Sequence, residues 1–146
     1  MALFQAFDIS ASGMTAERFR TDIIAENVAN VNTTRTEDGT PYRRKVVTFA
    51  EKDSVSFKDM LSRARSYGGN GVKVTKVLED TETDYIMSYD PAHPDADENG
   101  YVSYPNVNIV TEMTNLIDAS RGYEANVTAF NAVKAMAQAG LQVGKA

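Results

Sequence analysis

Residues 107–143 read VNIVTEMTNLIDASRGYEANVTAFNAVKAMAQAGLQV and contain no proline, a residue that breaks helix interiors. Mostly apolar residues recur along this stretch at alternating steps of three and four positions. This is the heptad spacing of a helix that packs on another helix. The predicted seam consists of Met113, Leu116, Ser120, Tyr123, Val127, Phe130, Lys134, Ala137 and Leu141. We therefore predict one helix over residues 107–143, about 55 Å long at ~1.5 Å per residue.

A second long helix is predicted over residues 3–30, which also lack proline. Ile9, Ala16 and Ile23 follow one another at seven-residue spacing, and Ser12 and Phe19 form the interleaved row. Both predicted helices far exceed the mean helix of ~11–12 residues. Nearly half of this 146-residue chain would therefore lie in two helices.

Charge is depleted in the C-terminal segment. Residues 106–146 hold only six charged side chains, whereas residues 36–105 hold 22 among 70. The polar positions of the C-terminal helix are instead occupied mainly by asparagine and threonine. Few charges with neutral polar groups retained are typical of a surface that is buried against other proteins. We expect both terminal helices to pack on several sides.

The middle of the chain holds all four prolines, from Pro41 to Pro105, and predicts short strands. These strands are expected at residues 44–49, 72–77, 85–89 and 101–104, with one short helix at 57–64. The predicted fold class is α+β, with the long terminal helices pairing as an antiparallel-type coiled coil. Residues 1–35 and 106–146 would form this axial core domain, and residues 36–105 a small, mostly β outer domain.

Composition excludes several functions. A net charge of −5 and a pI near 4.9 argue against nucleic-acid binding. Without cysteine there are no disulfides or thiolate sites, and His93 is the single imidazole. Residues 95–100 resemble the start of a calcium loop, but the twelfth position is Asn106 instead of glutamate, so we predict an acidic turn. We expect no catalytic site, cofactor, metal or small-molecule substrate.

The N-terminal residues lack the basic region and apolar core of a secretory signal, and no apolar run reaches the ~18 residues of a membrane span. We expect a chain that carries no cleaved signal. A short basic cluster, Arg35, Arg43, Arg44 and Lys45, predicts a solvated strand end. Contact with an acidic partner or a cell-wall polymer is the alternative.

Two asparagines close the first predicted helix. Asn30 can satisfy the terminal carbonyl groups as a C-cap. Asn27 would then lie inside the helix, where asparagine has poor propensity. Because the cap needs only one asparagine, Asn27 is predicted to form a hydrogen bond to another helix.

These stretches resemble a known family. Residues 27–33 (NVANVNT) and 121–126 (RGYEAN) resemble the paired terminal motifs of flagellar axial proteins, and residues 41–43 (PYR) and 99–107 (NGYVSYPNV) resemble the proximal members of the flagellar basal-body rod protein family. The resemblance covers essentially the whole chain. It implies a structural subunit of the proximal rod. A distal-rod type of axial protein, a secreted coiled-coil adaptor and a small enzyme are the alternatives.

The resemblance also implies a mode of assembly. The chain would be exported unfolded through the flagellar type III apparatus and would polymerise through its terminal helices into a helical lattice. Expected partners are other rod proteins, the protein at the junction of the MS ring and the rod, and the export apparatus. The expected assembly contacts are Asn27, Asn30, Thr33, Met113, Leu116, Arg121, Tyr123, Asn126, Val127 and Phe130.

Overall fold

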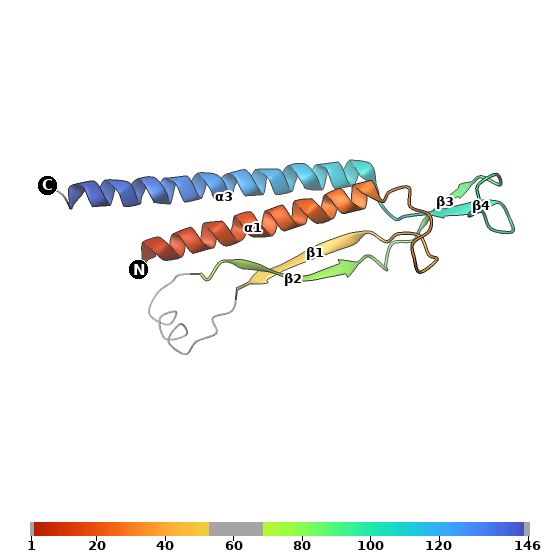
Figure 1. The fold of residues 1–146 in the computed structure, drawn as a ribbon, viewed down its shortest axis with the longest axis horizontal. Coiled ribbons are helices and arrows are strands. Elements are labelled where there is room, and N and C mark those ends of the chain that lie inside the picture. The colour runs from red at the N-terminus through yellow and green to blue at the C-terminus, as the bar shows by residue number, and fades with distance from the viewer. Residues whose placement is uncertain (1, 53–68, 145–146) are drawn as a thin grey trace.

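Two long antiparallel helices dominate the structure, a computed structural model that describes residues 2–52 and 69–144 (Figure 1). Helix α1 spans Ala2–Ala29 and helix α3 spans Ile109–Val143, within two residues of the predicted bounds. The α+β class is confirmed. The short helix expected at residues 57–64 lies outside the described residues. Neither long helix is apolar enough over a sufficient length to cross a membrane.

The middle segment forms two separate two-stranded antiparallel sheets. Strands β1 (Lys45–Glu51) and β2 (Val72–Glu79) pair as a ribbon that lies along α1 on the side away from α3 (Figure 1). Strands β3 (Ile86–Tyr89) and β4 (Tyr101–Tyr104) pair as a hairpin that extends beyond the end of the helix pair. All four strands lie near the predicted positions. Helix α1 is the central layer, between α3 and the β1–β2 ribbon.

Contacts along the helix pair follow one antiparallel register. Residue numbers rise on α1 as they fall on α3 through the contacts Phe7–Phe130, Gly13–Asn126, Glu17–Gly122 and Asn27–Glu112. Small residues let the two backbones approach closely, and a Cβ atom added at Gly13 would lie 2.5 Å from Asn126 Oδ1. Ala16 and Ala119 are buried on the same stretch.

The face of α3 that packs on α1 differs from the predicted seam. The buried and half-buried positions of α3 are Glu112, Asn115, Ala119, Gly122, Asn126, Val127, Phe130, Val133 and Ala137. Between Met113 and Tyr123, each residue of the predicted seam comes one position after a residue of the packed face. One position is a rotation of about 100° around the helix axis. The prediction is wrong over this half, whereas Val127, Phe130 and Ala137 of the predicted seam are half-buried. The physical reason is that small and polar side chains, not large apolar ones, fill the narrow helix interface between Glu112 and Gly122.

Two residues of the predicted row on α1, Ile9 and Ser12, lie against the ribbon. Ser12 Oγ accepts a hydrogen bond from the Val72 amide at 3.0 Å, and Ile9 lies beside Gly71. Gly71 has a φ of +85° and leaves no room for a side chain, because its Cβ would lie 2.3 Å from Ser12 Oγ. One helix face therefore holds the ribbon, and the adjacent face holds α3.

The close approach at Gly13 predicts a stability effect. Gly13→Leu would force Asn126 out of its place, and we expect it to lower the free energy of unfolding by about 2 kcal/mol in urea denaturation followed by circular dichroism. The matched variant Gly140→Leu lies in α3 with no atom within 4 Å of its Cβ. It should raise stability by up to about 1 kcal/mol through helix propensity. Equal effects of the two variants would contradict this packing.

Candidate assembly surface and its polar junction

Asn27 is the centre of a polar junction between the two helices and the first strand. Its side chain is fully buried, and all four of its hydrogen-bonding positions are occupied. Nδ2 donates to the Lys45 carbonyl at 2.8 Å and to Glu112 Oε2 at 3.0 Å. Oδ1 accepts from the Lys45 amide at 2.8 Å and from the Tyr42 hydroxyl at 2.9 Å. The predicted hydrogen bond from Asn27 to another helix is confirmed.

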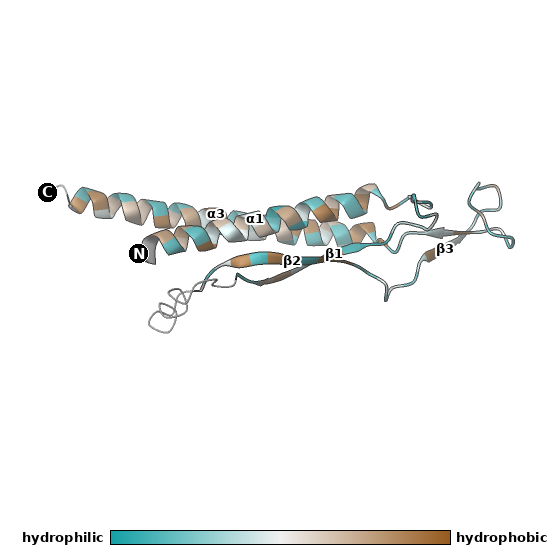
Figure 2. Ribbon diagram, turned by 60° about the horizontal axis from the view of Figure 1, so that its bottom comes forward, coloured by the Kyte–Doolittle hydropathy of each residue, from teal (hydrophilic) through white to brown (hydrophobic). Residues whose placement is uncertain are grey.

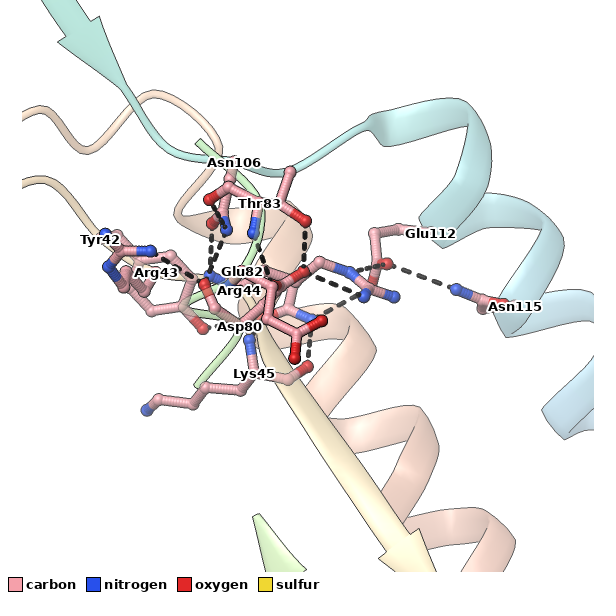
Figure 3. A network of polar contacts seen from close by, with 11 residues as sticks. Tyr42, Arg43, Arg44, Lys45, Asp80, Glu82, Thr83, Asn106, Glu112 and Asn115 are labelled. Carbon is pink, nitrogen blue, oxygen red and sulfur yellow. Dashed lines mark hydrogen bonds and ion pairs between the residues drawn. The ribbon is translucent and has the colours of Figure 1, made fainter. Parts of the chain in front are cut away.

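A second asparagine, Asn106, bonds to the backbone at the start of β1 and after β2 (Figure 3). Its Oδ1 accepts from the Arg44 amide at 2.9 Å. Its Nδ2 donates to the carbonyl groups of Asp80 and Thr83 at 2.9 and 3.1 Å. Two asparagine side chains, one from α1 and one from the segment before α3, therefore fix the start of β1.

Glu112 is a carboxylate with no exposed surface, and Arg44 supplies its counter-charge. Arg44 Nε donates to Glu112 Oε1 at 2.8 Å, and Asn115 Nδ2 approaches the same oxygen at 3.3 Å (Figure 3). Arg44 also lies 3.9 Å from Asp80. A buried ionised carboxylate is tolerated only when it is paired and hydrogen-bonded. This requirement turns Glu112 inward and sets the rotation of α3 about its axis.

The basic cluster is engaged inside the chain. Besides Arg44, the Lys45 ammonium pairs with Glu26, and Arg35 lies 3.7 Å from Asp95. Arg43 donates to the Asp80 carbonyl, and its guanidinium stacks over the Tyr85 ring at 4.4 Å. The prediction of a solvated strand end is therefore wrong for Arg43, Arg44 and Lys45, which are half-buried and bonded within the chain, whereas the Arg35 side chain is 70% exposed.

Asn30 and Thr33 end α1 and direct the chain toward the junction. Asn30 Nδ2 donates to the Glu26 carbonyl at 2.9 Å, and Thr33 Oγ1 donates to Asn30 Oδ1 at 3.1 Å. The Tyr42 amide then donates to the Thr33 carbonyl. Asn30 caps a terminal carbonyl as predicted, without adopting a left-handed backbone.

The C-terminal motif has a buried half and an exposed half. Asn126 Nδ2 donates to the Gly122 carbonyl at 2.8 Å, and Gly122 faces Glu17. Arg121 and Tyr123 are exposed, and within the described part of the chain Arg121 forms no ion pair. Val127 is half-buried, and the half-buried Phe130 packs edge-on against Phe7 at 4.8 Å.

Large apolar side chains of α3 lie outside the helix interface. We call this surface the outer stripe: Ile109, Val110, Met113, Leu116, Ile117 and Tyr123, which are between 36% and 74% exposed. Figure 2 shows apolar residues recurring along the whole of α3. The structure therefore separates the ten predicted contact residues. Asn27 is internal, whereas Met113, Leu116, Arg121 and Tyr123 are available to a partner, and their contact with neighbouring subunits stays a prediction.

Several junction residues escaped the sequence analysis. Glu112 and Asn106 gave no local signal of their function, because their partners lie 68 to 85 and 23 to 62 residues away in the chain. A lone acid in the charge-poor start of α3 was the one available hint. Among the described residues, no three acidic or histidine side chains come together as a metal site.

Known proteins are similar to this sequence over nearly its full length. A family model described as Flagella basal body rod protein matches residues 7–35, and one described as Flagellar basal body rod FlgEFG protein C-terminal matches residues 98–143. The chain is 44% identical to the flagellar basal-body rod protein FlgC of Bacillus subtilis, over 99% of this chain and 100% of the relative. Identity is 41% to the FlgC of Borreliella burgdorferi, with 98% of both chains covered, and 40% to that of Escherichia coli O6:H1, with 99% of this chain and 100% of the relative covered.

Removing the Asn27 side chain should loosen the junction. Asn27→Ala leaves the Lys45 backbone, the Tyr42 hydroxyl and Glu112 short of partners, and we expect a loss of about 3 kcal/mol in the free energy of unfolding. The control Asn32→Ala changes an exposed asparagine three residues beyond the end of α1 and should alter stability by less than about 0.5 kcal/mol. Similar losses in both variants would contradict the central role of Asn27.

Tyr42 should titrate late. Burial, with a smaller contribution from Glu26 and Glu112, raises the pKa of Tyr42 from 10.0 to about 12. Because the folded pKa exceeds the unfolded one, its contribution to stability is complete below about pH 10 and lost as the pH rises through about 12. Ultraviolet absorbance of the phenolates should show one late-titrating tyrosine that Tyr42→Phe removes. An unchanged curve in that variant would contradict the assignment.

Proposed function

The chain belongs to the FlgC group of flagellar basal-body rod proteins, and from this premise we propose that it is a subunit of the proximal rod that polymerises through α1 and α3 into a hollow drive shaft. It is a structural protein and not an enzyme. The chain covers the whole length of its FlgC relatives, which supports this function over that of a distal-rod type.

The outer stripe is the observation that carries the proposal. Met113, Ile117 and Val110 are 57%, 53% and 74% exposed on a helix whose opposite side is already packed. A contiguous exposed apolar surface marks a site of protein–protein contact. Neighbouring subunits would bury it, and Arg121 and Tyr123 at its C-terminal end would add a planar donor and an aromatic ring to the contact.

Helix α3 also extends beyond its intramolecular partner. The antiparallel register brings the first residue of α1 opposite Ala137, so the last turns of α3 project past α1 (Figure 1). Leu141 and Val143 on this projection are 70% and 79% exposed. The projection supports end-to-end contact with the next subunit, and a contact between two different surfaces propagates as a helix when it does not close into a ring.

The total surface supports the same function. The chain exposes 10409 Å², whereas a compact monomer of 16.0 kDa exposes about 7400 Å². Buried apolar side chains of the described residues are few: Ala16, Ile24, Tyr42, Val102, Val107 and Ala119.

The remaining parts of the proposal follow from the family. The subunit would be exported by the flagellar type III apparatus without a cleaved signal and would lie in the periplasmic part of the basal body. Its neighbours would be other rod proteins and the protein at the MS-ring junction. In the rod, α1 and α3 would pack as a coiled coil. Asn27, Asn30 and Thr33 would serve assembly by fixing the end of α1, and Met113, Leu116, Arg121 and Tyr123 by direct contact.

Weakening the outer stripe tests the proposal. We expect the double variant Met113→Ser/Leu116→Ser to fold, since both side chains are exposed, and to be exported, but to be incorporated into rods at least about tenfold less, as found when apolar anchors leave an interface. The measurement is the amount of the chain in purified basal bodies, with swimming in soft agar as a second readout.

The control is Met113→Leu/Leu116→Met, which keeps the apolar surface and should assemble normally. Normal rods in the serine variant would contradict the contact. A closed, stable dimer of the wild-type chain that never enters basal bodies would favour the secreted adaptor instead.

A further inference from the structure

The β3–β4 hairpin carries an exposed apolar face, and acidic residues flank its strands in sequence. Met87, Tyr89 and Tyr101 share one face of this two-stranded sheet, because Tyr89 pairs directly with Tyr101 and Met87 lies two residues from Tyr89. They are 55%, 65% and 44% exposed, and the two tyrosine rings meet edge-on at 5.3 Å. We call this face, with the exposed Asp84 and Glu98 beside it in sequence, the hairpin patch.

The acidic charge of this region is concentrated in sequence, and in the fold Asp80 and Asp95 lie beside Arg44 and Arg35. Eight of the 20 acidic residues lie between Glu79 and Glu98, a stretch that contains none of the 15 basic residues. The rest of the chain holds 12 acidic and 15 basic residues and is therefore net positive. Such an arrangement favours a basic partner surface and repels another acidic one.

A chemically complementary surface lies on the β1–β2 ribbon. Val46 and Leu78 are opposite each other and share a face with Lys76, two residues from Leu78. Val46 and Leu78 are 36% and 49% exposed, and Lys76 is exposed. We call these three residues the ribbon patch. The two strands together with Lys52 carry four lysines and two glutamates, of which Lys45 pairs with Glu26 and Glu79 also begins the acidic stretch, so the ribbon has a small net positive charge where the hairpin is acidic.

We propose that the hairpin patch of one copy docks on the ribbon patch of a neighbouring copy of this chain. Within one molecule the two patches are kept apart, because the hairpin extends beyond the helix pair whereas the ribbon lies beside α1 (Figure 1). An apolar face beside acids meets an apolar face beside a lysine, so burial of the apolar side chains and charge complementarity act together.

This contact would add a second, outer connection between subunits. The two patches are different surfaces, so the contact is heterologous and repeats from copy to copy instead of closing a dimer. It rests on the proposed function, because it needs copies held side by side by their helices. Two connections at different distances from the helix pair would resist twisting of one subunit against the next more than the helices alone.

Cysteine cross-linking in assembled basal bodies tests the contact. The chain has no cysteine, so single cysteines give a clean background. Cells would produce two differently tagged versions, one with Met87→Cys and one with Leu78→Cys, and mild oxidation should yield a disulfide-linked heterodimer. Either version alone should yield none. As a control, Thr40→Cys, exposed in the turn between α1 and β1, paired with Leu78→Cys should also yield none.

Charge reversal provides the second arm. Asp84→Lys/Glu98→Lys in the Met87→Cys version should lower the heterodimer yield at least about fivefold, and Lys52→Glu/Lys76→Glu in the Leu78→Cys version should restore it. Glu37→Lys/Asp38→Lys, which changes net charge equally at another exposed turn, should leave the yield unchanged.

The outcomes separate this contact from the proposed function. Basal bodies that contain both versions but no heterodimer would overturn the contact and leave the rod function intact. A heterodimer that is insensitive to both charge reversals, or equally sensitive to the control reversal, would also overturn it. Absence of the wild-type chain from basal bodies would refute the proposed function itself.

Discussion

The structure depends on the burial of one asparagine with every hydrogen-bonding position occupied. Asn27 bridges the backbone of Lys45, the hydroxyl of Tyr42 and the carboxylate of Glu112, so three segments meet at this side chain: the end of α1, residues 42–45 and the start of α3. A buried amide that lacks any of these partners is costly, so the groups must arrive together. Their arrival fixes the end of α1, the start of α3 and the start of β1.

This constraint determines what the subunit presents to others. Because Glu112 must face Asn27 and Arg44, α3 turns its small and polar residues toward α1. The large apolar residues in its first half, such as Met113 and Ile117, consequently face outward, whereas Phe130 further along packs on Phe7. Polar contacts thus hold the two helices of the chain together, and apolar side chains stay exposed for neighbouring subunits. An ordinary monomer buries its apolar side chains and exposes its polar ones. Close packing at Gly13 and Gly122 makes this arrangement possible without a large apolar seam between the helices.

Much of the fold was predictable, because its signals are local. The absence of proline from the two chain ends predicts both helices. Alternating β-branched and aromatic residues predict the four strands. Asn27 was recognised as a surplus polar residue inside a helix, and it does bond to another helix. The rotation of α3 was not predictable from its heptad pattern, since that pattern marks an apolar stripe without saying whether the chain itself or a neighbour covers it. Glu112 and Asn106 were not predicted, and Arg44 was predicted to be solvated, because their contacts exist only once distant segments meet.

The most direct test of this account is the rate of thiol labelling at single cysteines placed along the first half of α3 in the isolated chain. Cysteines at positions 113, 116 and 117 should react at nearly the rate of a free thiol, whereas one at position 119, which is fully buried, should be strongly protected. Protection at 113 and 116 with fast labelling at 119 would show that the apolar residues face α1, and would contradict the account.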